Sequence, residues 1–158
     1  MSEEVLNIVL YQPEIPQNTG NIGRTCVLVN AKLHLIKPLG FDIDEKKVRR
    51  AGLDYWKNVN YEIHESFEAF VEKYPDARIF LATTKGTKFY TDAKFEEGDF
   101  IVFGRESSGL PKDIMETYTE SSIKIPMIDS TTRSLNLSNT ASIIAYEALR
   151  QIGFPNMR

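Results

Sequence analysis

The segment DFIVFGRESSGLP, residues 99–111, contains the pattern that decides the fold. Residues 99–103 predict a strand, because their apolar run FIVF is typical of a strand buried on both faces of a parallel sheet. The run ends in a polar loop framed by Gly104 and Gly109, and Pro111 then suits the first turn of a helix. The segment therefore predicts a strand, a loop and a helix, the repeating unit of an α/β fold.

Similar apolar runs along the chain predict further strands. They occupy residues 6–11, 32–36, 60–63, 78–83 and 122–126. Helical spacing of apolar residues separates them, at residues 18–30, 65–74, 111–118 and 137–152. Because no repeat, linker or shift in composition divides the chain, we expect one α/β domain over residues 1–158, with a mostly parallel sheet flanked by helices.

The composition excludes several classes of protein. The chain has 158 residues, 42% hydrophobic and 26% charged, which excludes collagen-like and disordered classes. No apolar run approaches the ~20 residues that span a bilayer, and the acidic start differs from a signal peptide, so we expect a cytoplasmic protein without a membrane segment. A single cysteine, Cys26, leaves too few thiols for a zinc ribbon or an iron–sulfur site. We therefore expect no metal.

The charge balance argues against indiscriminate binding of polyanions. The net charge is −3, whereas affinity for a nucleic-acid backbone normally needs a broad basic surface. One basic cluster, EKKVRRAG at residues 45–52, nevertheless contains Arg49 and Arg50. A solvated helix face is the commoner explanation of such a cluster, and contact with phosphate is the alternative.

The loop PEIPQNTGNIGRT, residues 13–25, follows the first predicted strand. Asn18 or Thr19 can cap the next helix, and Arg24 would then lie one turn inside it, where a phosphate or a developing oxyanion is stabilised. A helix cap with a surface arginine explains the loop equally well. The spacing of its glycines is not a dinucleotide or P-loop fingerprint, although KH modules that bind single-stranded RNA also use GxxG.

Two further loops follow predicted strands and are rich in polar groups. In residues 103–111, Glu106 could orient Arg24 or balance a cationic ligand, or it could simply be a charge at a helix start. In residues 125–151, Ser134, Asn136 and Ser138 crowd the start of the last helix more densely than capping requires, which favours a polar ligand. In open α/β sheets, ligands bind beyond the carboxyl ends of the strands, where these loops are expected to meet.

The three loops together resemble a known family. NTGNIGRT, FGRESSGLP and IPMIDSTTRSLNLSNTASIIAYEA resemble, in order and spacing, the three motifs of the SPOUT superfamily of RNA 2′-O-ribose methyltransferases. The compact length and RRAGLDYW, residues 49–56, are most similar to the small bacterial branch that methylates the wobble ribose, at cytidine or modified uridine 34, of leucine tRNAs. The loop DSTTRS, residues 129–134, is slightly longer than the family pattern.

The resemblance implies a fold, a cofactor and partners. It implies a SPOUT fold that ends in a deep trefoil knot, S-adenosyl-L-methionine as the cofactor and the tRNA anticodon loop as the substrate. It also implies a homodimer whose active site is shared between subunits. Two copies could join the basic residues into one groove, which answers the objection from net charge.

Roles of individual residues are also implied. Arg24 matches the family's essential arginine, often drawn as a general base. Because a guanidinium with a pKa above ~12 resists deprotonation, we expect Arg24 to stabilise a developing alkoxide or to clamp a phosphate. Asn18 would orient Arg24 or the ribose, Glu106 would lie beside the site, and Asn136 would connect the third loop to it.

The same resemblance predicts binding residues. Cofactor contacts are implied for Ala82, Thr83, Gly104, Ile125 and Ser134. RNA contacts are implied for Arg49, Arg50, Arg133 and Tyr146, and helix packing is the alternative role for Tyr146.

Three other functions remain to be weighed. An RNA-binding module would use the GxxG loop and the basic cluster, but it leaves the second and third motifs unexplained. A cysteine enzyme is disfavoured because Cys26 lies on an apolar helix stripe and neither His34 nor His64 shows a pairing motif. A ribose methyltransferase acting at another position of tRNA or ribosomal RNA is the alternative within the enzyme class.

Overall fold

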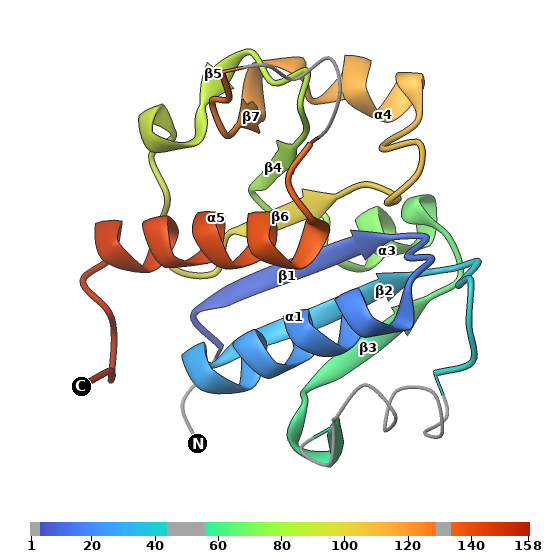
Figure 1. Cartoon of the computed structure of the whole chain (residues 1–158), viewed down its shortest axis with the longest axis horizontal. Helices are drawn as coiled ribbons and strands as arrows, with labels where there is room; N and C mark the ends of the chain where they lie inside the picture. The colour runs from blue at the N-terminus through green and yellow to red at the C-terminus, as the bar shows by residue number, and fades with distance from the viewer. Residues whose placement is uncertain (1–3, 44–55, 129–133) are drawn as a thin grey trace.

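A parallel sheet lies at the centre of the computed structural model, which describes residues 4–43, 56–128 and 134–158 (Figure 1). Within these residues the sheet has seven strands in the order β3-β2-β1-β6-β4-β7-β5, and each neighbouring pair is parallel. The strands are β1 Leu6–Tyr11, β2 Ala31–Ile36, β3 Tyr61–His64, β4 Ile79–Ala82, β5 Lys88–Phe89, β6 Phe100–Phe103 and β7 Ser122–Lys124.

Helices cover both faces of this sheet. The α-helices are α1 Pro16–Val29, α3 Phe67–Lys73, α4 Lys112–Thr117 and α5 Leu137–Gln151, and the 3-10 helices are η1 Trp56–Asn58, η2 Tyr90–Asp92 and η3 Thr119–Ser121. In Figure 1, α1 and α5 lie side by side in front of the sheet, and α3 lies behind it. None of the described helices is long and apolar enough to cross a membrane.

Alternating side chains of the central strands build two cores. On β1, Ile8 and Leu10 belong to the core beneath α1 and α5, whereas Val9 belongs to the core beneath α3 and α4. These three side chains are 2% exposed or less. Burial on both faces explains why the strands read as continuous apolar runs in the sequence.

The predicted α/β order is confirmed, and the differences lie at element ends. β5 was not predicted, because a two-residue strand leaves no periodic pattern. The first helix begins at Pro16 rather than at residue 18, and its N-cap is Ile15, whose side chain makes no cap hydrogen bond. The prediction that Asn18 or Thr19 caps this helix is therefore wrong, because both lie inside its first turn.

Candidate active site

A cavity of about 550 Å³ lies beyond the carboxyl ends of β4, β6 and β7. Its wall is formed by the start of α1, the loops that follow β4, β6 and β7, and the start of α5. Eight of the predicted site residues line it: Asn18, Ala82, Thr83, Gly104, Glu106, Ile125, Ser134 and Asn136. The fold therefore brings four segments that are distant in sequence to one polar cavity.

The loop after β6 is closed tightly at its base. Arg105 and Gly109 exchange two backbone hydrogen bonds, of 3.1 and 2.9 Å. A Cβ atom at Gly104 would lie only 2.5 Å from the carbonyl carbon of Gly109. Only glycine fits at this close approach, and the closure leaves the loop tip, residues 106–108, at the cavity wall.

The carboxylate of Glu106 binds the start of α1. It accepts hydrogen bonds from the backbone N–H groups of Glu14 (2.9 Å) and Ile15 (3.0 Å) and from the side-chain amide of Asn18 (3.3 Å). A carboxylate is favourable at a helix N-terminus, where free N–H groups and the helix dipole meet. Glu106 thus supplies from another loop the cap that α1 lacks in its own sequence.

Asn18 contributes to the same contact. Its side chain is 5% exposed, and its amide donates to Glu106. This hydrogen bond joins the first loop to the second. Asn18 therefore holds the cavity wall together. The orientation of Arg24 or a ribose by Asn18 stays a prediction.

Arg105 received no role in the sequence analysis, and the structure places it beside the cavity. Its guanidinium stacks on the Tyr11 ring at 5.3 Å and donates to the side-chain carbonyl of Gln12 (3.2 Å) and to the carbonyl of Gly109 (3.1 Å). These contacts tie the loop after β6 to the end of β1. No sequence pattern could have shown them, because they depend on β1 and β6 being neighbours.

At the start of α5, Asn136 is the N-cap residue. Its side-chain oxygen accepts hydrogen bonds from the N–H (2.9 Å) and the hydroxyl (2.6 Å) of Ser138. Capping therefore accounts for two of the residues whose density suggested ligand binding. Ser134 and Asn136 still line the cavity, so the start of α5 remains available to a ligand.

Arg24 and Tyr146 lie elsewhere among the described residues. Arg24 is exposed and is the ninth residue of α1, so the expectation that it lies one turn inside the helix is wrong. Its role toward an oxyanion or a phosphate stays a prediction. Tyr146 is 42% exposed on α5. Neither residue is part of the cavity wall. The remaining predicted RNA contacts, Arg49, Arg50 and Arg133, lie outside the described residues.

Cys26 is buried beneath α1, as its place on the apolar stripe predicts. Its side chain is 1% exposed, and burial raises the pKa of its thiol to about 12. Since a nucleophilic cysteine must be a thiolate, the cysteine-enzyme hypothesis is excluded.

His34 and His64 form a pair that the sequence analysis missed. His34 Nδ1 lies 3.0 Å from His64 Nε2, and His34 Nε2 lies 3.0 Å from the side-chain oxygen of Asn7. Burial, then the charge of His64, lowers the pKa of His34 to about 3, and burial lowers the pKa of His64. Neighbouring β2 and β3 bring the two rings together, which no local motif could show.

Glu62 lies close enough to this pair to complete a set of three metal-ligating groups. Its carboxylate, however, already forms ion pairs with Lys32 (3.1 Å) and Lys73, and it accepts a hydrogen bond from the Tyr74 hydroxyl (2.6 Å). Two ammonium groups compete with a cation for the same oxygens. The cluster is therefore an ion-pair network on the sheet, separate from the residues that line the cavity.

The cavity is polar and lies at the carboxyl ends of a parallel sheet, and the loop after β6 can close beside it only because residue 104 is glycine. Such a cavity is typical of α/β enzymes that bind a nucleotide-like cofactor. The model of the SpoU rRNA Methylase family matches residues 5–146. The chain belongs to this family of methyltransferases.

Individual relatives agree with this result. The tRNA (cytidine(34)-2'-O)-methyltransferase of Escherichia coli strain K12 is 47% identical over 152 residues, which cover 96% of each chain. A solved structure described as giving insights into the 2-OH methylation of C/U34 on tRNA has a TM-score of 0.86 and 47% identity, covering 92% of this chain and 95% of that one.

A third relative concerns the cofactor. The SpoU methyltransferase AviRb from Streptomyces viridochromogenes, solved in complex with AdoMet, has a TM-score of 0.78 and 26% identity, covering 96% of this chain and 59% of that one. The cavity of about 550 Å³ is large enough for such a molecule, and Gly104 and Gly109 are both part of its wall. S-adenosylmethionine is therefore the cofactor that fits both the family and the cavity.

Proposed function

We propose that this chain transfers a methyl group from S-adenosylmethionine to the ribose 2′-hydroxyl of nucleotide 34 of tRNA, with leucine tRNAs as substrates. The observation that carries the proposal is the meeting of the three motif loops on one cavity. The 47% identity with the E. coli tRNA (cytidine(34)-2'-O)-methyltransferase over 96% of both chains supports the choice of nucleotide. Residues 1–158 would act as a single methyltransferase domain in the cytoplasm.

The cofactor would be held mainly by backbone groups of the cavity wall. When bound, S-adenosylmethionine supplies an electrophilic methyl group on a sulfonium, so the transfer needs no metal. Gly104 lines the cavity in the loop after β6, and Ser134 offers a hydroxyl to the same cavity from the segment before α5. The proposed contacts are Ala82, Thr83, Gly104, Ile125 and Ser134.

Arg24 would stabilise the negative charge that develops on the ribose oxygen, or hold a neighbouring phosphate. Asn18, Glu106 and Asn136 would shape the cavity in which the ribose is aligned with the methyl group. Alignment matters because a near-attack geometry can supply roughly 7 to 11 kcal/mol of the barrier reduction.

A homodimer would bring Arg24 of one copy to the cavity of the other. Arg24 lies on the exposed side of α1. Four large apolar side chains are also exposed on α1 and α5, namely Val27, Leu28, Ile143 and Tyr146. The two helices lie side by side (Figure 1), so these side chains are suited to covering by a second copy. Tyr146 would lie at the edge of this interface, where it could reach the target nucleotide together with Arg133.

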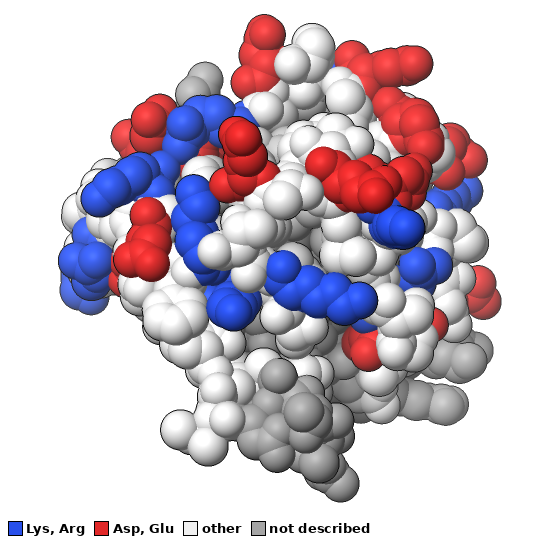
Figure 2. Space-filling view, turned by 90° about the horizontal axis from the view of Figure 1, so that it is seen from above, with Lys and Arg blue, Asp and Glu red and all other residues white. Residues whose placement is uncertain are grey.

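RNA would approach across charged surface. The face seen in Figure 2 carries both signs, with Lys and Arg side chains across the middle of the view and many Asp and Glu side chains toward its upper edge. Lys85 and Lys124 line the cavity and could contact phosphate. Arg49 and Arg50 would extend this basic surface in the dimer.

The chain would end in a deep trefoil knot. The segment after β4 packs tightly on β7: the N–H of Thr83 donates to the carbonyl of Ile123 (2.9 Å), and that of Thr87 donates to the carbonyl of Ser122 (3.2 Å). At Gly86 a Cβ atom would collide with the backbone of Ile123. This close packing of the segment after β4 against a later strand supports the proposed knot.

The test is methyl transfer from labelled S-adenosylmethionine to bulk bacterial tRNA, followed by mapping of the labelled nucleotide. We expect label at the ribose of nucleotide 34 of leucine tRNAs, and its loss in Arg24→Ala. Label at another position of tRNA or in ribosomal RNA would retain the chemistry and overturn the substrate. Folded protein that binds the cofactor and labels no RNA would overturn the proposed function.

A further inference from the structure

The first and second loops of the cavity are joined by carboxylates in both directions. Glu106, in the loop after β6, accepts hydrogen bonds from the backbone of Glu14 and Ile15. Glu14 returns the contact, since its carboxylate accepts from the backbone N–H and the hydroxyl of Ser107, each at 2.9 Å. Glu14 therefore donates to Glu106 through its backbone and accepts from the adjacent Ser107 through its side chain. These hydrogen bonds close a ring between the two segments.

The two halves of this ring act on different parts of the site. The Glu106 half fixes the start of α1. The Glu14 half fixes the tip of the loop after β6, because both donors of Ser107 point to Glu14. Gly104 and Gly109 close the base of that loop, and the hydrogen bonds from Ser107 to Glu14 hold its tip at the cavity together with those that Glu106 accepts.

The charge of Glu14 suits this role. Hydrogen bonds from the N–H and then the hydroxyl of Ser107 lower the pKa of its carboxyl, and the charge of Arg105 adds to the effect. The carboxylate is therefore ionised at neutral pH, and hydrogen bonds to an ionised acceptor are the stronger kind.

We propose that Glu14 is a positioning residue for the cofactor: through Ser107 it holds the loop after β6 in the conformation that binds S-adenosylmethionine. The inference rests on the proposed function, because it concerns the same cavity. Glu14 acts at one remove, since Glu14 itself is not part of the cavity wall, whereas Ser107 is. Without the carboxylate the loop tip samples other conformations, and the cofactor must select the competent one.

The experiment compares Glu14→Ala, Ser107→Ala and the double variant with the wild-type chain. Equilibrium binding of labelled S-adenosylmethionine is measured without RNA, and KM and kcat are measured with tRNA. The control is Glu65→Gln, which removes an exposed carboxylate paired with Lys37, away from the cavity. Thermal unfolding is recorded for every variant, to separate a local effect on the loop from a loss of folded protein.

We expect Glu14→Ala to weaken cofactor binding about tenfold, the loss typical of a charge-assisted contact that is partly screened by solvent. KM for the cofactor should rise by a similar factor, with kcat at saturation and the melting temperature nearly unchanged. Ser107→Ala should have a smaller effect, because its backbone N–H remains, and the double variant should bind no more weakly than Glu14→Ala.

Two outcomes would overturn the inference. Cofactor binding by Glu14→Ala equal to that of Glu65→Gln would show that the ring does not position the loop. Additive losses in the double variant would show that Glu14 acts independently of Ser107. If the wild-type chain binds the cofactor and methylates no RNA, the proposed function fails while the binding comparison still decides the role of Glu14. A wild-type chain that does not bind the cofactor would overturn both.

Discussion

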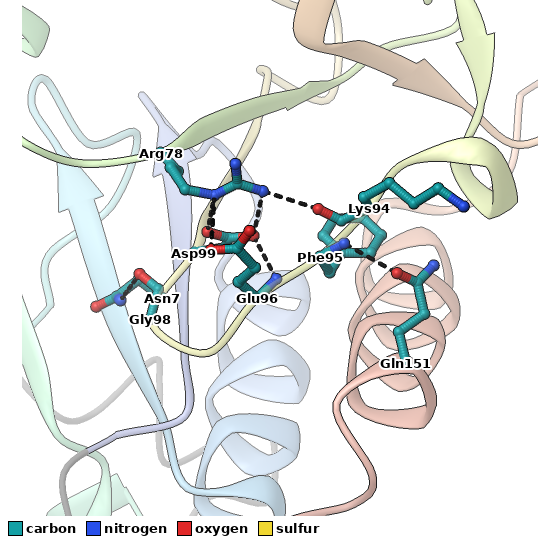
Figure 3. A network of polar contacts seen from close by, with 8 residues as sticks. All are labelled: Asn7, Arg78, Lys94, Phe95, Glu96, Gly98, Asp99 and Gln151. Atoms are coloured by element: carbon teal, nitrogen blue, oxygen red, sulfur yellow. Dashed lines mark hydrogen bonds and ion pairs between the residues drawn. The ribbon is translucent and has the colours of Figure 1, made fainter.

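The two ends of the sheet are both held by carboxylates, but in different ways. At the carboxyl ends of the strands, Glu14 and Glu106 accept hydrogen bonds mainly from backbone N–H groups of partly exposed loops. At the amino ends, Asp99 is 1% exposed, and Arg78 donates to both of its carboxylate oxygens at 2.8 and 3.3 Å (Figure 3). The first arrangement holds loops around a cavity, whereas the second fixes where two strands begin.

The amino-end network is also more extensive. Asp99 accepts from the N–H of Glu96 (2.7 Å), and Arg78 donates further to the carbonyl of Lys94 (2.8 Å). Close by, the N–H of Phe95 donates to the side chain of Gln151 on α5 (2.9 Å; Figure 3). The residues drawn there serve packing and strand order. The contacts that order the strands and the cavity that would hold a ligand therefore lie at opposite ends of the same sheet.

The largest expected effect comes from breaking the cavity end. Gly104→Ala places a Cβ atom 2.5 Å from the backbone of Gly109, so the loop after β6 must open. We expect a loss of about 3 kcal/mol in the free energy of unfolding. We also expect methyl transfer to fall at least about 100-fold, because the cavity wall is displaced. Urea unfolding and transfer of labelled methyl to tRNA measure the two effects, and we expect equilibrium binding of the cofactor to weaken as well.

A matched control for this substitution is Gly153→Ala. Gly153 has a positive φ of 87° at the end of α5, with open space around it and away from the cavity. Its substitution should cost stability through backbone strain and leave cofactor affinity near the wild-type value. Normal cofactor binding by Gly104→Ala would show that the close approach at the loop base is unrelated to the cavity.

A smaller effect is expected from breaking the amino end. Asp99→Asn removes the charge that pairs with Arg78 and replaces one acceptor oxygen by an amide nitrogen facing the guanidinium or the N–H of Glu96. Because the carboxylate is buried while Arg78 remains about half exposed, we expect a loss of about 2 kcal/mol in the free energy of unfolding.

Cofactor affinity should stay unchanged in Asp99→Asn, which is the sharpest contrast with Gly104→Ala. Chemical unfolding together with binding of labelled S-adenosylmethionine measures both quantities. A loss of cofactor affinity at full stability would contradict the division between the two ends.

The sequence predicted the architecture well because buried strands and amphipathic helices leave local patterns. It also placed eight residues of the cavity wall among the predicted site residues, because the resemblance assigned Asn18, Glu106 and Asn136 to motifs. It could not predict the start of α1, since Glu106 caps that helix from 91 residues away in sequence. Ile15 is a poor N-cap by itself, so local capping rules pointed to the wrong residue.

Other contacts were hidden for the same reason. Arg78 and Asp99 meet because β4 and β6 are neighbours in register, and this strand order is not written in either segment. The two histidines meet because β2 and β3 are neighbours. Periodicity shows which face of a strand is buried, but a polar contact between strands requires knowing which strands are adjacent.

The smallest effect concerns the pH dependence of stability and extends the amino-end network. Asn7 connects the amino-end network to the histidine pair, since its amide donates to the carbonyl of Gly98 (3.1 Å) and its oxygen lies 3.0 Å from His34 Nε2. The buried His34 has its pKa lowered to about 3, so in the folded state it remains neutral as the pH falls. Around it, the carboxylate of Glu62 favours the charged form, whereas His64, Lys32 and Lys73 disfavour it.

The sign of the effect follows from proton uptake. An unfolded histidine, with a pKa near ~6.5, binds a proton at a pH where folded His34 does not, so acid favours unfolding. We expect the free energy of unfolding to fall by about 1 kcal/mol from pH 7 to pH 5.5, and to be insensitive to His34 above pH 7. In His34→Gln the fall in the free energy of unfolding between pH 7 and pH 5.5 should be smaller by about 1 kcal/mol. An equal slope in both proteins would show that His34 is protonated in the folded state, and that the His34–His64 pair opens rather than excludes the proton.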